Sequence, residues 1–115
     1  MSAFPFPGIN LAITTPFDAD GKIDFARFEH LIERYLHAGI QSFVLSSGTG
    51  MHVYLTREES RQLVAFGAKA IDGRAKVIVQ TSALLVDEVV ERTRHAADCG
   101  ADGVMVLPPF FEGPT

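Results

Sequence analysis

The chain has 115 residues, of which 47% are hydrophobic and 21% are charged, and its formal net charge is −4. This length and composition are typical of one globular domain with a hydrophobic core. The acidic balance counts against a nucleic-acid surface, which usually needs a basic patch. No apolar run approaches the ~20 residues of a membrane span, and the first residues lack the basic and apolar regions of a signal peptide. These features predict a cytoplasmic protein with no nucleic-acid and no membrane partner.

Four short apolar segments are predicted as strands, and three amphipathic segments that alternate with them are predicted as helices. The strands are Ile9–Ile13, Ser42–Leu45, Val77–Gln80 and Gly103–Leu107. Continuous apolar strands in this order indicate a parallel sheet whose strands are buried on both faces. The strands start about 30 residues apart, the period of βα units joined by right-handed crossovers. Both an open doubly wound sheet and a (βα)8 barrel fit this order.

The first two predicted helices have clear boundaries. Asp24 is a good N-cap for the first helix, and Gly39 is suited to end it. The apolar face of this helix comprises Phe25, Phe28, Ile32 and Tyr35. The second helix begins with a capping box formed by Thr56 and Glu59, and Asp72-Gly73 closes it.

The third helix is predicted over about Leu85–Cys99, with Gly100 after it. The residues expected to face inward are Val86, Val89, Val90, Thr93, Ala96 and Ala97. Cys99 is the only cysteine, so no disulfide framework or thiolate metal cluster is expected, and it is interpreted as a small buried hydrophobe. His30 and His37 lie seven residues apart, which is not the spacing of a helical zinc pair. No metal site is predicted.

Ligands of parallel α/β folds bind at the carboxyl ends of the strands, so the segments that follow the strands are the candidates. The glycine loop, Ser46–Gly50, is the best of them. Its two glycines allow a tight turn, and its amides with the hydroxyls of Ser47 and Thr49 could converge on an anion such as a carboxylate. It is neither a Walker loop nor a dinucleotide fingerprint. A plain tight βα connection remains the alternative.

Three other segments near the strand ends are weaker candidates. Thr14–Phe17 is interpreted mainly as a turn in which proline ends the first strand. His52 and Tyr54 lie just beyond the glycine loop, where either could position a substrate or donate a proton, or could face solvent. Paired aromatics in Pro108–Phe111 could wall a pocket or meet another subunit.

At these residues the chain resembles the N-terminal half of the dihydrodipicolinate synthase/N-acetylneuraminate lyase family. The matching segments are Thr15–Phe17, Asp20–Phe25, Ser47–Met51, Leu55–Glu59, Gly100–Asp102 and Pro108–Phe111. They cover essentially the whole chain in the order of the family pattern. This is more specific than any single motif.

The resemblance implies that residues 1–115 form the first four strands of a single (βα)8 barrel. It also implies a homo-oligomer, a tetramer or dimer of dimers, that binds pyruvate or another 2-oxo acid as a Schiff base on a lysine. That lysine and a proton-shuttling tyrosine are expected beyond Thr115, so no catalytic residue and no cofactor is expected in this chain. The residues expected to bind the substrate carboxylate are Ser47, Gly48 and Thr49. The residues expected in a pocket or interface are Thr15, Phe110 and Phe111.

The sequence departs from the family pattern at three places. Gly48 stands where the family has a hydroxyl, although Ser47 could compensate, and Met51 replaces a glutamate. A phenylalanine, Phe110 or Phe111, stands where a tyrosine often reaches a neighbouring subunit's site. Because phenylalanine cannot relay protons, these departures favour an aldolase, lyase or dehydratase acting on another 2-oxo acid over dihydrodipicolinate synthesis.

A full barrel needs roughly 250 residues, so the chain is predicted to be a fragment of a longer enzyme, inactive alone and with two open sheet edges. The lysines present, Lys22, Lys69 and Lys76, are placed on a turn, a helix and the start of a strand, and none is expected to act as nucleophile. The alternatives are a non-catalytic paralogue and a small-molecule-binding open α/β domain. A phospho-acceptor domain is disfavoured because Thr14-Thr15 and Thr81-Ser82 stand where it needs acidic residues.

Overall fold

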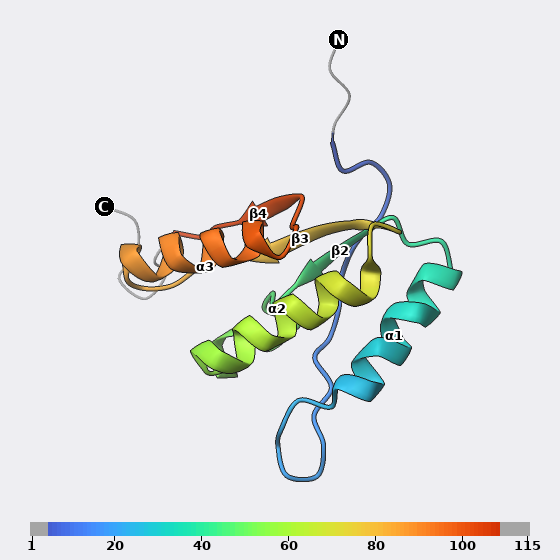
Figure 1. Cartoon of the computed structure of the whole chain (residues 1–115), viewed down its shortest axis with the longest axis horizontal. Helices are drawn as coiled ribbons and strands as arrows, with labels where there is room; N and C mark the ends of the chain where they lie inside the picture. The colour runs from blue at the N-terminus through green and yellow to red at the C-terminus, as the bar shows by residue number, and fades with distance from the viewer. Residues whose placement is uncertain (1–4, 109–115) are drawn as a thin grey trace.

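Four strands alternate with three α-helices in the computed structural model, which describes residues 5–108 (Figure 1). The elements are β1 (Asn10–Ala12), α1 (Phe25–His37), β2 (Ser42–Leu45), the 3-10 turn η1 (His52–Tyr54), α2 (Arg57–Ile71), β3 (Lys76–Gln80), α3 (Val86–Asp98) and β4 (Gly103–Met105). No helix among these residues is long and apolar enough to cross a bilayer.

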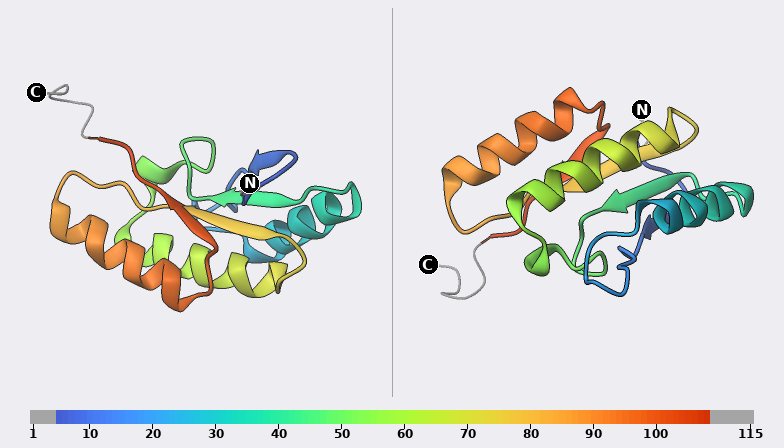
Figure 2. Two further views of the ribbon diagram at one scale, coloured as in Figure 1. Left: turned by 90° about the horizontal axis from the view of Figure 1, so that it is seen from above. Right: turned by 60° about the horizontal axis from the view of Figure 1, so that its bottom comes forward.

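The strands form one parallel sheet in the sequential order β1-β2-β3-β4. The three helices lie on the same face of this sheet (Figure 2). A doubly wound sheet instead reverses its strand order and carries helices on both faces. The barrel-type arrangement predicted from the sequence is therefore confirmed, and the open doubly wound alternative is wrong. Within the described residues, β1 and β4 are the sheet edges.

The helix ends follow the predicted caps. Asp24 accepts a hydrogen bond from the Arg27 amide at 3.0 Å. At α2, the Thr56 hydroxyl accepts from the Glu59 amide at 3.1 Å, and the Glu59 carboxylate accepts from the Thr56 amide at 2.9 Å. Gly39 has φ +91° after α1, a conformation that glycine adopts without strain. These contacts fix where α1 begins and ends and where α2 begins.

The core lies between the sheet and the helices. The fully buried side chains that meet there include Phe28, Ile32, Phe43, Leu45, Leu63 and Ile71. The Phe25 and Phe66 rings, 4.9 Å apart between centroids, join α1 to α2 beside this cluster. The predicted apolar face of the first helix is thus confirmed, and the burial of α1 and α2 on the sheet positions the loops at the carboxyl ends of the strands.

Two predicted strands are too long. Ile9 lies outside β1 and is 69% exposed, because β1 pairs from Asn10 opposite Ser42, which is the first residue of β2. Likewise β4 ends at Met105, opposite Gln80, the last residue of β3. Beyond that point the Leu107 amide donates to the Ser82 hydroxyl at 2.7 Å instead of to a strand carbonyl.

The outer part of the sheet is also less buried than predicted. The exposed apolar residues of β4 and its continuation are Val104, Met105, Val106 and Leu107. On α3, Val89 and Thr93 are half-buried and Ala96 is buried, but Val86, Val90 and Ala97 are exposed, so their predicted inward position is wrong. The reason is that α3 packs against α2 on one side only among the described residues, and these three side chains lie on the other side.

Candidate functional site

The glycine loop lies at the carboxyl end of β2 and is tied to the end of β1. The Thr15 hydroxyl is buried and donates to the Gly50 carbonyl at 2.7 Å. Just after the loop, the Met51 amide donates to the Gly48 carbonyl at 3.0 Å, and the His52 amide donates to the Ser47 carbonyl at 3.1 Å. The loop is therefore a compact turn held by backbone bonds, with Thr15 serving as its brace.

The three residues expected to bind a carboxylate occupy different environments. Ser47 is 7% exposed, and its hydroxyl has no hydrogen-bond partner among residues 5–108. Gly48 and Thr49 are exposed, and a Cβ added to Gly48 would meet nothing within 4 Å. The loop thus leaves room for a ligand beside Gly48, with hydroxyls on either side in sequence. Hydroxyl and amide donors of this kind suit a carboxylate.

The hydroxyls after β3 make structural bonds. The Thr93 hydroxyl on α3 donates to the Thr81 hydroxyl at 2.9 Å, and Ser82 accepts from the Leu107 amide. The first bond links the end of β3 to α3, and the second links the segments that follow β3 and β4. Thr81 and Ser82 therefore lie at the edge of the site, and the hydroxyl oxygen of each already accepts a hydrogen bond from the protein.

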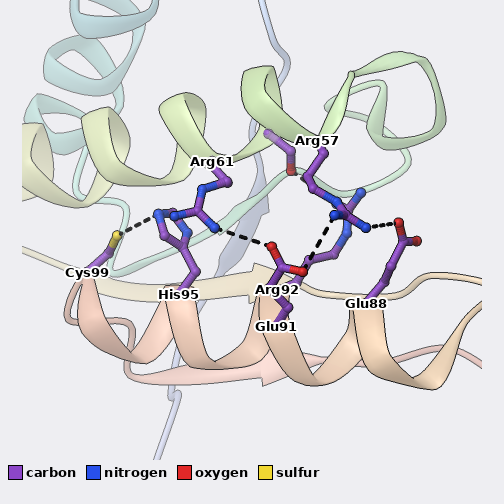
Figure 3. Close-up of polar contacts among 8 residues, drawn as sticks. Arg57, Arg61, Glu88, Glu91, Arg92, His95 and Cys99 are labelled. Carbon is purple, nitrogen blue, oxygen red and sulfur yellow. Dashed lines mark hydrogen bonds and ion pairs between the residues drawn. The ribbon is translucent and has the colours of Figure 1, made fainter.

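A cavity of about 300 Å³ lies between η1, the segment after β3 and the first half of α3. Its polar lining includes His52, Ser82, Glu88 and Arg92. Figure 3 shows Arg57 and Arg61 from α2 meeting Glu88 and Glu91 from α3. Inside the described residues, the buried His52 Nδ1 and Arg92 Nε have no hydrogen-bond partner.

His52 and Tyr54 separate in the structure. Tyr54 is 73% exposed, whereas His52 is half-buried and lines the cavity. Burial lowers the pKa of His52, and the nearby Arg92 charge lowers it further, while a hydrogen bond with the Ser82 backbone opposes this. The imidazole is therefore held in its neutral form to a lower pH than an exposed histidine.

The depressed pKa of His52 predicts a pH-dependent stability. The unfolded chain takes up this proton near pH 6.5, before the folded chain does, so the free energy of unfolding should fall as pH drops below about 6.5.

Arg92→Met should raise the His52 pKa, as measured by NMR titration of the imidazole. Arg94→Met, an exposed change on the same helix, is the control. An unchanged His52 titration in Arg92→Met would contradict the coupling.

The lysines lie where the sequence predicts. Lys22 is exposed in the turn after β1, Lys69 is exposed on α2, and Lys76 begins β3, with its ammonium 3.8 Å from Asp102. Cys99 packs partly buried against the core, and burial raises the pKa of its thiol. Phe110 and Phe111 lie outside the described residues.

Two residues near the glycine loop were missed from the sequence: Ser60 and Arg92. Arg92 gave one signal, since it stands four residues before Ala96, a position predicted to face inward. Its guanidinium donates to the Ser60 hydroxyl at 3.2 Å, which lies 3.4 Å from the Ser46 hydroxyl. The spacing of apolar residues along one helix does not predict a contact that joins two helices to the end of a strand.

Comparisons with known proteins agree on one family. Residues 5–115 match the model of the dihydrodipicolinate synthetase family. A 4-hydroxy-tetrahydrodipicolinate synthase of Alkaliphilus oremlandii is 40% identical over 106 residues, which are 92% of this chain and 36% of that protein. The chain thus spans just over a third of the length of this curated relative.

Solved structures give the same result. A dihydrodipicolinate synthase from Aquifex aeolicus has a TM-score of 0.91 at 35% identity, covering 96% of this chain and 37% of its own. A prophage protein of E. coli K12, solved in complex with pyruvate, has a TM-score of 0.91 at 30% identity, covering 94% of this chain and 36% of its own. The four-stranded sheet therefore corresponds to the first strands of larger barrels.

Proposed function

Because the chain belongs to the dihydrodipicolinate synthetase family, we propose that it supplies β1–β4 of a single-domain (βα)8-barrel lyase acting on pyruvate or another 2-oxo acid. The parallel sheet with its helices on one face supports this, since catalytic groups of such barrels gather at the carboxyl ends of the strands. The complex of the E. coli relative with pyruvate favours the same substrate class.

The observation that carries the proposal is the glycine loop at the end of β2. Gly48 and Thr49 are exposed there, while the Ser47 hydroxyl is buried and without a partner among the described residues. In the proposed complex these donors hold the carboxylate of the 2-oxo acid. This fixes the neighbouring carbonyl carbon in position for attack.

The covalent step needs residues beyond Thr115. A lysine amine adds to the carbonyl carbon, water leaves, and the resulting Schiff base draws electrons from the adjacent carbon so that a carbon–carbon or carbon–oxygen bond can form or break. This chain's part is to bind and orient the acid. The chain alone is expected to be inactive, and assembly as a tetramer stays a prediction.

The test is a chimera in which this chain replaces the matching first segment of the Aquifex aeolicus enzyme. With pyruvate and borohydride, the reduced Schiff base should appear as a covalent adduct by mass spectrometry on the chimera and not on the 115-residue chain. Thr49→Val should raise the pyruvate concentration for half-maximal trapping by about tenfold, because a charge-assisted hydrogen bond is lost.

The lysines of this chain provide the control for specificity. Lys76→Arg keeps the positive charge beside Asp102 and should leave trapping unchanged. A folded chimera without any adduct would contradict the proposed substrate class. An adduct mapped to the first 115 residues would contradict the expected position of the nucleophile.

A further inference from the structure

A chain of polar contacts runs from α3 through α2 to the start of the glycine loop. The Arg92 guanidinium donates to the Ser60 hydroxyl at 3.2 Å, and Ser60 and Ser46 hydroxyl oxygens are 3.4 Å apart. Ser46 and Ser60 are 1% and 6% exposed, so neither hydroxyl is freely hydrated. Figure 3 shows Arg92 among the α2–α3 contacts, between the two helices.

The direction of these bonds follows from the chemistry of the groups. An arginine only donates, so Ser60 must accept from it, and the Ser60 proton is then free to point toward Ser46. A hydroxyl that accepts from a cation becomes a better donor. The Ser60 hydroxyl therefore joins Arg92 to Ser46, and either hydroxyl can be the donor in the Ser46–Ser60 bond.

Ser46 is the residue at which the backbone leaves β2 and enters the loop. Its φ is +57°, in the left-handed region that a non-glycine residue enters only at a cost in energy. This backbone conformation sets the direction of Ser47, Gly48 and Thr49. A contact that holds Ser46 therefore acts on the orientation of the donors that follow it.

We propose that Arg92 is a positioning residue for the glycine loop, acting through Ser60 on the left-handed Ser46. This rests on the proposed function, because the loop is the part that would hold the carboxylate. In this role Arg92 does not touch the substrate. It lowers the number of conformations that the loop can adopt before the ligand arrives.

The test follows amide hydrogen exchange of Gly48, Thr49 and Gly50 by NMR in the unliganded chimera described above. Ser60→Ala removes the central hydroxyl and leaves the guanidinium, and it should speed exchange at these amides by about tenfold. Arg92→Met should do the same, and Arg92→Lys, which can still donate, should restore part of the protection. Arg94→Met, on the exposed side of α3, should change nothing.

A double variant distinguishes an effect of Arg92 on the glycine loop from a general loss of stability in α2 and α3. Ser46→Gly adopts the left-handed conformation without strain, so the loop no longer depends on the contact chain. Adding Arg92→Met to Ser46→Gly should then leave loop exchange unchanged, a non-additive result. Equal acceleration across all of α2 and α3, or additive effects in the double variant, would overturn the proposal.

The readout does not depend on the proposed function. Loop exchange is measured without ligand, so failure of pyruvate trapping in the chimera leaves this result standing. Conversely, normal exchange in Ser60→Ala overturns the positioning role even if trapping succeeds. Should Arg92→Met fail to fold, Ser60→Ala and the double variant Ser46→Gly/Ser60→Ala decide the question in the same way.

Discussion

Phe28→Ala is expected to lower the free energy of unfolding by about 3–5 kcal/mol. The Phe28 ring of α1 is 0% exposed and packs in the core where α1 meets α2 and the sheet. Its centroid is 6.2 Å from that of Phe66, and it would meet a Cβ placed on Gly67 at 3.3 Å. Removing the ring leaves a cavity that rigid neighbours on three elements cannot close, so both transfer energy and packing are lost.

Urea denaturation of the 115-residue chain measures this effect. The stability of a small domain is typically about 5–15 kcal/mol, so the loss is a large fraction of the total and the midpoint should shift strongly at unchanged slope. Val86→Ala is the matched control, since Val86 is 76% exposed and should change stability by about 0.5 kcal/mol or less. Similar midpoints for the two variants would show that the helix layer is not the core.

The contrast between these two residues shows what the sequence can predict. Phe28 belongs to a stripe at helical spacing that is bounded by a capping aspartate, and local pattern and cap agree with the structure. Val86 also belongs to an apolar stripe, on α3, yet it is exposed. Periodicity shows that a face is apolar, but which part of the face is covered depends on the neighbouring elements.

The candidate site shows the same division. The position of the glycine loop followed from strand order alone, because the carboxyl ends of parallel strands share one edge of the sheet. The roles of individual hydroxyls did not follow, since Thr15 bonds to Gly50, which lies 35 residues away. Contacts across such separations depend on the register between strands and on rotamers, which a single sequence does not fix.

Gly50→Ala is expected to distort the glycine loop and lower the free energy of unfolding by about 1–3 kcal/mol. An added Cβ would lie 3.2 Å from the Ile13 carbonyl oxygen, 3.3 Å from the Ser47 amide nitrogen and 3.3 Å from the Thr15 hydroxyl. Two of these atoms are backbone, and the third is already held by its bond to the Gly50 carbonyl. The loop must therefore move away from the end of β1.

Gly48→Ala is the matched control, because a Cβ there would meet nothing within 4 Å. It should leave thermal stability nearly unchanged, by about 0.5 kcal/mol or less. In the chimera, however, both variants should weaken pyruvate trapping by about tenfold or more, Gly50→Ala by displacing the donors and Gly48→Ala by filling the space beside them. Gly48→Ala should therefore weaken binding without a loss of stability, whereas Gly50→Ala should lower both. Trapping that is unaffected by Gly48→Ala would place the carboxylate elsewhere, and unchanged stability in Gly50→Ala would show that the loop is not braced against β1.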